Sequence, residues 1–126
     1  MISAMYQEKT AQVSEVVQNY FEGIYHGNVE QLRSSFAETT YIYGDVKGQE
    51  YAKSIEDYLA GVAGRKSPKE LGENFEMEIT GISFIGNNAL VNAHLPMLGY
   101  NYYDYLLLSV VNDEWKIVGK IFSHVE

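Results

Sequence analysis

The sequence contains no cysteine, which excludes disulfides, zinc–thiolate sites, iron–sulfur clusters and thiol nucleophiles together. It also lacks any apolar run approaching the roughly 20 residues that a membrane-spanning helix requires. Basic residues are scarce, because 9 Lys and Arg stand against 17 Asp and Glu, a formal net charge of −8. Such a chain has no general attraction for phosphate backbones or anionic lipid. We therefore expect neither a nucleic-acid nor a membrane partner.

The chain has 126 residues, about the length of one domain, and we expect a single domain over residues 1–126. A chain of this size buries a sizeable core without needing disulfides or a structural metal. Residues 1–10 have neither the basic start nor the long apolar run of a signal peptide. We therefore expect a cytoplasmic protein.

Helical periodicity occurs in three places in the first half of the chain. Over residues 7–25 the apolar side chains recur every three or four positions and form one stripe. Asn28 is placed to cap a second, shorter helix, and Ser54 begins a capping-box pattern before a third helix at about 55–62. Between these helices, residues 39–43 are β-branched and aromatic, which predicts a short strand.

From Glu73 onward the hydrophobic period changes to two, which predicts strands. Gly81 interrupts the alternation and indicates a β-bulge. The four strands are expected at about 73–85, 89–98, 102–111 and 115–124. Helices followed by strands favour the α+β class, with three helices packed on one curved, mostly antiparallel sheet.

Four stretches carry a resemblance to a known family: VQNYFEGIYHGN at 17–28, residues 32–36, YDYLLL at 103–108 and DEWKIVGKIF at 113–122. They are similar to the Y-F-x-G start, the L…F continuation and the D-x-L-x-L…G-x-W-K-I ending of the family called "putative lumazine-binding". That family lies in the NTF2-like superfamily, also called cystatin-like or SnoaL-like. The resemblance implies a cone-shaped fold around a pocket. Superfamily members include isomerases, dehydratases, cyclases and non-catalytic assembly domains, so the fold does not choose a function.

Asp104 is the sharpest candidate for chemistry, because its neighbours Tyr103 and Tyr105 predict a desolvated carboxyl with a raised pKa. In the resembled fold, concave-face carboxylates serve some enzymes as general acids or bases. Lys120 is a candidate partner. A three-residue loop after Val111 places Lys120 on the face of Asp104, whereas a two-residue loop places the two on opposite faces. The sequence leaves both registers open.

His94 is a second candidate for proton transfer, because histidine titrates near neutral pH. A structural hydrogen bond is the alternative role for this strand residue. The expected ligand-binding residues share a place in the roof or wall of the resembled cone. They are Tyr20, Tyr41, Tyr43, Tyr58, Asp104, Lys120 and Phe122. The three histidines lack metal-ligand spacing and no cofactor motif occurs, so we expect neither a metal nor a cofactor.

Three functions remain open. The first is an NTF2-like domain that binds a small apolar or aromatic molecule in the cone pocket. The second is a cofactor-independent isomerase, dehydratase or cyclase that uses Asp104 and His94. The third is a non-catalytic dimerisation or interaction domain. We also expect a homodimer through the open sheet face, because both faces of strand 102–111 are largely apolar while helices can cover only one.

Overall fold

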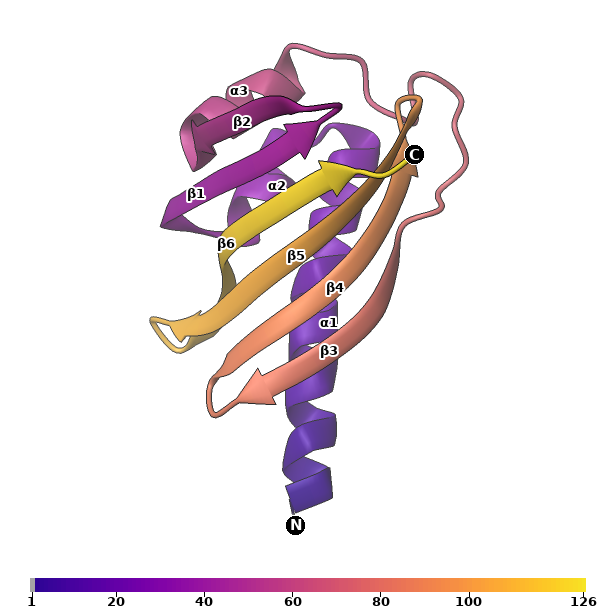
Figure 1. The fold of residues 1–126 in the computed structure, drawn as a ribbon. Helices are drawn as coiled ribbons and strands as arrows, with labels where there is room; N and C mark the ends of the chain where they lie inside the picture. The colour runs from indigo at the N-terminus through magenta and orange to yellow at the C-terminus, as the bar shows by residue number, and fades with distance from the viewer. Residues whose placement is uncertain (1) are drawn as a thin grey trace.

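The computed structural model describes residues 2–126 as helices that lie along one side of a six-stranded sheet (Figure 1). The helices are α1 (Ile2–His26), α2 (Val29–Ser34) and α3 (Ile55–Ala63). The strands are β1 (Phe36–Val46), β2 (Gln49–Ser54), β3 (Glu78–Ile85), β4 (Asn88–Met97), β5 (Tyr100–Val111) and β6 (Glu114–His124). They lie in the order β2-β1-β6-β5-β4-β3, with β1 and β6 parallel and the other neighbours antiparallel. The expected α+β cone with a mostly antiparallel sheet is confirmed.

The helices divide the sheet into an inner face, which they cover, and an outer face, which lies toward the viewer in Figure 1. The apolar stripe of α1 faces the core, and five of its six residues are fully buried, while Val16 is half-buried; the five are Val13, Val17, Tyr20, Phe21 and Ile24. Alternate residues of the central strands complete the core from the sheet side. These are Val91, Ala93 and Leu95 of β4, and Leu106 and Leu108 of β5. The core therefore lies between α1 and one face of the sheet.

Both predicted helix caps are present. The side chain of Asn28 accepts a hydrogen bond from the backbone N–H of Gln31 at 3.1 Å and begins α2. Ser54 does the same for Asp57 at 3.2 Å and begins α3. Each cap satisfies a backbone donor that the first turn of a helix leaves without a partner.

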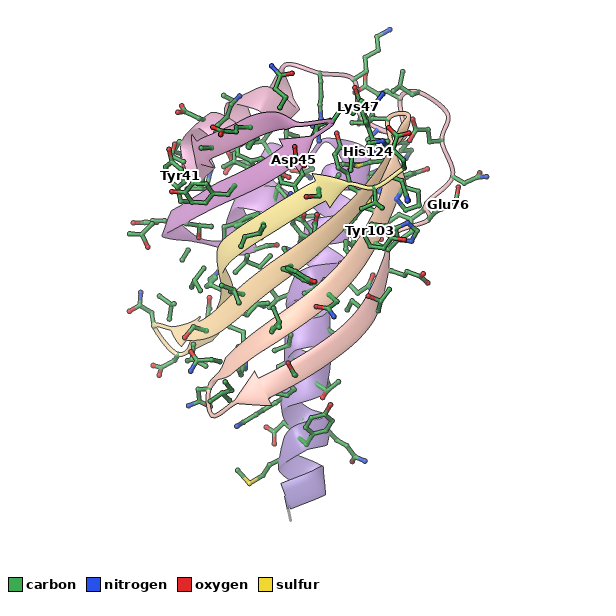
Figure 2. The ribbon with its side chains drawn as sticks, viewed as in Figure 1. Tyr41, Asp45, Lys47, Glu76, Tyr103 and His124 are labelled. Carbon is green, nitrogen blue, oxygen red and sulfur yellow. The ribbon has the colours of Figure 1, made fainter. Side chains whose placement is uncertain are left out.

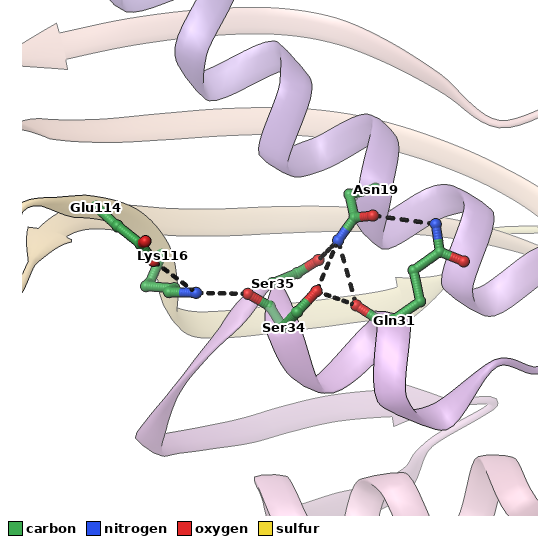
Figure 3. Close-up of polar contacts among 6 residues, drawn as sticks. All are labelled: Asn19, Gln31, Ser34, Ser35, Glu114 and Lys116. Atoms are coloured by element: carbon green, nitrogen blue, oxygen red, sulfur yellow. Dashed lines mark hydrogen bonds and ion pairs between the residues drawn. The ribbon is translucent and has the colours of Figure 1, made fainter.

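Polar side chains hold α2 between α1 and β6 (Figure 3). The amide of Asn19 donates to the carbonyl of Gln31 and to the hydroxyl of Ser35, and the amide of Gln31 donates back to Asn19 Oδ1. On the other side, Lys116 Nζ donates to the carbonyl of Ser34 at 2.7 Å. The start of β1 is thereby fixed beside β6.

Two strand assignments differ from the sequence expectation. β2, which pairs with β1 across the turn at Lys47 and Gly48, is not predicted, because it is an edge strand with mostly exposed residues and no clear alternation. Residues 73–77 are not a strand, and β3 begins only at Glu78. The bulge expected at Gly81 is confirmed by a register shift in the β3–β4 ladder.

The β5–β6 turn takes the shorter of the two forms considered. Val111 pairs with Glu114, so only two residues form the turn. Asn112 and Asp113 both have left-handed backbones, with φ of 51° and 66°. This combination is the type I′ geometry that suits the twist of two antiparallel strands.

A bulge at Val118 then changes the register of the same ladder. Beyond it, Lys120 pairs with Leu106 and Phe122 with Asp104. These are the pairs expected from a three-residue loop, although the loop has two residues. The bulge supplies the extra residue, and Asp104 and Lys120 therefore share the inner face.

Candidate functional site

A cavity of about 110 Å³ lies on the inner face, beneath α3 and the segment that follows it. This volume is room for about four water molecules or a compact organic molecule of similar bulk. Its apolar wall consists of Val46, Leu95, Met97 and Phe122. Its polar lining consists of Tyr51, Tyr58, Tyr102, Arg65, Asp104 and Lys120. A mostly apolar wall with a few convergent polar groups is typical of small-molecule sites.

Asp104 is held at this cavity by α1. It points inward from β5 with only 3% of its surface exposed, and the hydroxyl of Tyr20 donates to its Oδ2 at 2.5 Å. Tyr20 itself is completely buried behind the carboxylate. Among the described residues, none donates a hydrogen bond to Asp104 Oδ1. One oxygen is therefore fixed by the protein, and the other can hydrogen-bond to a ligand, accepting when the carboxyl is ionised and donating when it is protonated.

Lys120 brings a buried ammonium group to the same place. Its Nζ donates to the hydroxyl of Tyr58 at 3.1 Å and lies 4.0 Å from Asp104 Oδ2. Nζ also lies 4.5 Å from the ring centre of Tyr58, 5.1 Å from that of Tyr20 and 5.2 Å from that of Phe122. Cation–π attraction from the three rings offsets part of the hydration that the ammonium group loses.

Burial dominates the electrostatics of this group. It raises the pKa of the Asp104 carboxyl above its usual value, although the charge of Lys120 and the hydrogen bond from Tyr20 both act in the opposite direction. The pKa of Tyr20 is raised well above 10.0, first by burial and then by the neighbouring carboxylate. A cation in direct contact would lower the pKa of an aspartate; at 4.0 Å, without a hydrogen bond, Lys120 does not offset the desolvation.

Arg65 and two tyrosines form the mouth of the cavity. Arg65 is exposed and follows the glycine that ends α3. Burial raises the pKa of Tyr51 to about 12 and also raises that of Tyr102, and the charge of Arg65 opposes both shifts. Both tyrosine rings contact Phe122 edge-on. Phe122 lies over Gly44, where a Cβ atom would overlap the ring.

The structure brings five of the predicted residues together: Tyr20, Tyr58, Asp104, Lys120 and Phe122. The expectation that Tyr41 and Tyr43 line the pocket is corrected by the structure. They lie on the outer face, 45% and 56% exposed, and Tyr41 is labelled on β1 in Figure 2. The residue between them, Ile42, takes the inner position, because alternate residues of a strand point to opposite faces.

The expectation that His94 acts together with Asp104 is also corrected, because the two side chains lie on opposite faces of the sheet. It lies on the outer face, where its ring stacks on Tyr103 with centroids 4.4 Å apart, and its Nε2 contacts Asn101 Oδ1. Its strand neighbours Ala93 and Leu95 take the inner positions. The structural role considered for His94 matches these contacts.

The prediction misses Arg65, Tyr51 and Tyr102 at the mouth. Arg65 falls in a polar segment that resembles a solvated connection, and Tyr51 lies in the strand that the sequence does not predict. The one available signal for Arg65 is its position directly after the helix-ending Gly64. That signal indicates a loop but no particular pocket.

A larger groove of about 610 Å³ lies between the first half of α1 and the β5–β6 turn. Polar groups that line it already have partners: Trp115 Nε1 donates to Gln12 Oε1 at 3.0 Å, and Lys116 donates to Ser34. Its described ionisable residues are exposed or half-buried, in contrast to Asp104 and Lys120. This groove is larger than the cavity beside Asp104, but the buried ionisable groups favour the smaller cavity as the candidate site.

Within the part of the chain that the structure describes, no three His, Asp or Glu side chains gather closely enough to hold a metal ion. Of the described helices, none combines the length and apolar character needed to cross a membrane.

Solved structures identify the class of protein to which this architecture belongs. Three that are described as NTF2-like proteins of unknown function match nearly the whole chain. The one from Methylobacillus flagellatus KT has a TM-score of 0.84 at 21% identity, covering 94% of both chains. That from Shewanella baltica OS155 has a TM-score of 0.83 at 22% identity, covering 96% of this chain and 97% of its own. That from Silicibacter pomeroyi DSS-3 has a TM-score of 0.79 at 19% identity, covering 95% of this chain and 98% of its own.

The chain belongs to the family described as "putative lumazine-binding", whose model matches residues 8–123. The expected family and its NTF2-like fold are thus confirmed. No curated protein matches the chain. Because the structural matches share so little sequence, they show the fold and carry no activity over to this protein.

Proposed function

We propose that this protein binds a small molecule with an apolar or aromatic body and one polar group in the cavity of its inner face. The observation that carries the proposal is the buried Asp104 carboxyl, whose Oδ1 has no donor among the described residues. Asp104 Oδ1 can accept a hydrogen bond from a ligand when the carboxyl is ionised and donate one when it is protonated. Apolar walls around it suit the body of such a molecule.

The test is a titration with a panel of small aromatic and aliphatic compounds, followed by NMR of methyl groups. Methyl signals of Val46, Leu95 and Met97 should shift, because these residues line the cavity. Val46→Trp should abolish the shifts by filling the cavity. Val110→Trp is the matched control, since Val110 is also half-exposed but lines the larger groove. Shifts that are lost only in the control variant, or no shifts from any compound, would refute the proposal.

A second candidate function is proton-transfer catalysis by Asp104 on a molecule bound in the same cavity. The raised pKa of this carboxyl favours it, because a carboxyl that holds its proton closer to neutral pH is a better general acid or base. Incubation of each bound compound in deuterated water tests it. Deuterium that enters a C–H bond beside a carbonyl with the wild type, but not with Asp104→Asn, would support catalysis. No incorporation leaves binding as the function.

We infer that the outer face is covered by a second copy of the chain. Exposed apolar side chains from four adjacent strands support this inference; they are Tyr41, Tyr43, Leu90, Tyr103, Tyr105, Leu107, Val118 and Ile121. Two-fold association matches one such patch with itself. A non-catalytic interaction domain would need only this face, whereas the inner cavity supports the binding function as well. A cytoplasmic location, consistent with the absence of cysteine, completes the proposal.

A further inference from the structure

The cavity is cationic in a protein that is strongly acidic. Of the described residues that line it, Lys120 and Arg65 are basic and only Asp104 is acidic, whereas the whole chain has a formal charge of −8. The cavity therefore has one excess positive charge when Asp104 is ionised and two when it is protonated. A local excess of this kind attracts anions into a site that the rest of the molecule would repel.

Hydrogen-bond donors also outnumber acceptors in the cavity. Lys120 uses one of its three N–H bonds on Tyr58, and a second faces Asp104 at a longer distance. The Tyr58 oxygen accepts from Lys120, and a side-chain hydrogen bond also links Tyr58 to Tyr20. Arg65 has no carboxylate within ion-pairing distance among the residues described. Lys120 and Arg65 thus border the cavity as groups that only donate, Asp104 supplies its one carboxyl, and the hydroxyls of Tyr51 and Tyr102 can donate or accept.

We propose that the cavity binds a small monocarboxylate, whose oxygens accept from Lys120 and Arg65 and whose apolar body lies against Leu95 and Met97. This inference rests on the proposed binding function and names its ligand class. A cationic ligand would meet the buried ammonium group of Lys120 at short range. A neutral ligand would leave the excess positive charge uncompensated, so a monoanion fits the lining best.

Asp104 makes this binding depend on pH. The groups that face it are Tyr20 from α1, Tyr58 from α3, Lys120 from β6, Tyr102 from its own strand and, at the mouth, Tyr51 and Arg65. A bound carboxylate adds a negative charge beside Asp104, which favours its protonated form. The complex therefore takes up a proton, and the affinity falls as the pH rises above the pKa of Asp104 in the free protein.

The test compares isobutyrate with isobutyramide, which has the same shape without the charge, by NMR titration of the Leu95 and Met97 methyl groups. Isobutyrate should bind the wild type at least about tenfold more tightly than isobutyramide, and more tightly at about pH 5.5 than at about pH 8. Arg65→Met should remove most of this preference. Lys66→Met, which changes the adjacent exposed residue outside the cavity lining, should leave it unchanged.

Asp104→Asn provides a second, independent measurement. Asparagine resembles the protonated carboxyl, so this variant should bind isobutyrate with little dependence on pH. Isobutyramide binding as tightly as isobutyrate at the same methyl groups would overturn the carboxylate inference but leave the proposed binding function intact. No shift with either compound would overturn the inference, while the broader compound panel still decides the binding function. A preference for isobutyrate that survives Arg65→Met and does not vary with pH would also overturn it.

Discussion

Asp104 shows how a single buried carboxyl sets the balance between stability and function in this protein. It receives one strong hydrogen bond from Tyr20 and lies near the charge of Lys120, yet burial still raises its pKa. Keeping an ionised carboxylate in this position therefore costs folding free energy at neutral pH. Such costs are common at functional sites, where the arrangement serves binding or chemistry and not the stability of the fold.

Replacing Asp104 by Asn should change how stability depends on pH. With a raised pKa in the folded state, the wild-type carboxyl binds more protons folded than unfolded, so its contribution to stability falls as pH rises from 3.8 through the raised value. The stability of Asp104→Asn relative to wild type should therefore rise over this window, by about 1.4 kcal/mol for each unit of pKa elevation. Urea unfolding of both proteins across a pH series measures this difference in the free energy of unfolding. A difference that stays constant with pH would contradict the raised pKa.

The β5–β6 hairpin is the element that positions Lys120. Its two-residue turn alone would place Lys120 on the outer face, and the bulge at Val118 returns it to the inner face. Ile117 and Lys120, an odd number of positions apart, can thus both point inward. The position of the buried ammonium group depends on this local irregularity.

The same hairpin offers a direct test of its turn geometry. Asp113 has a φ of 66°, a conformation that glycine adopts more readily than any residue with a Cβ atom. Asp113→Gly should therefore stabilise the protein by roughly 0.5–1 kcal/mol, and Asp113→Ala should destabilise it by a similar amount. Thermal or urea unfolding measures both. Equal effects of the two substitutions would show that backbone strain at this turn does not control stability.

Across the whole molecule, the outer face presents ordered rows of side chains that run from strand to strand. One row passes through Tyr43, Ile121 and Tyr105, which are paired neighbours on β1, β6 and β5. The next passes through Leu107 and Leu90, on β5 and β4. Because these rows adjoin one another, the exposed apolar residues form a continuous patch, unlike the scattered apolar residues that are normal on a protein surface.

Leu107→Lys should convert the expected dimer to a monomer. Leu107 is 45% exposed within this patch, so a lysine there would place a charge in the interface of two copies. Sedimentation should show a wild-type dimer at about tens of micromolar and a monomeric variant. Val110→Lys is the control, because Val110 lies on the same strand and is 37% exposed but borders the groove on the helix side. A wild-type protein that is monomeric at this concentration would contradict the dimer.

Much of the architecture follows from the sequence alone, because it depends on local periodicity and capping. The apolar stripe of α1, the caps Asn28 and Ser54, and the alternation of β4 and β5 all lie within short segments of chain. Local patterns of this kind persist in the folded molecule. The resemblance to the family rests on the same segments, and it too is confirmed.

The composition of the site depends on contacts between segments that are distant in the chain. Tyr41, Tyr43 and Ile42 are all compatible with a core, and only the packing of β1 against the helices selects Ile42 for the inner face. Edge strand β2 has no alternating pattern of apolar residues, so the sequence predicts neither this strand nor the place of Tyr51 at the cavity.

Local periodicity alone establishes the class of fold and the residues that share a face in a strand without a bulge. Packing between distant segments selects which face points inward, places Lys120 beside Asp104 through the bulge, and brings Arg65 to the mouth of the cavity. A bulge changes strand parity by one residue at little local energetic cost, so local periodicity does not reveal it. Its position is selected by the packing of the whole sheet against the helices.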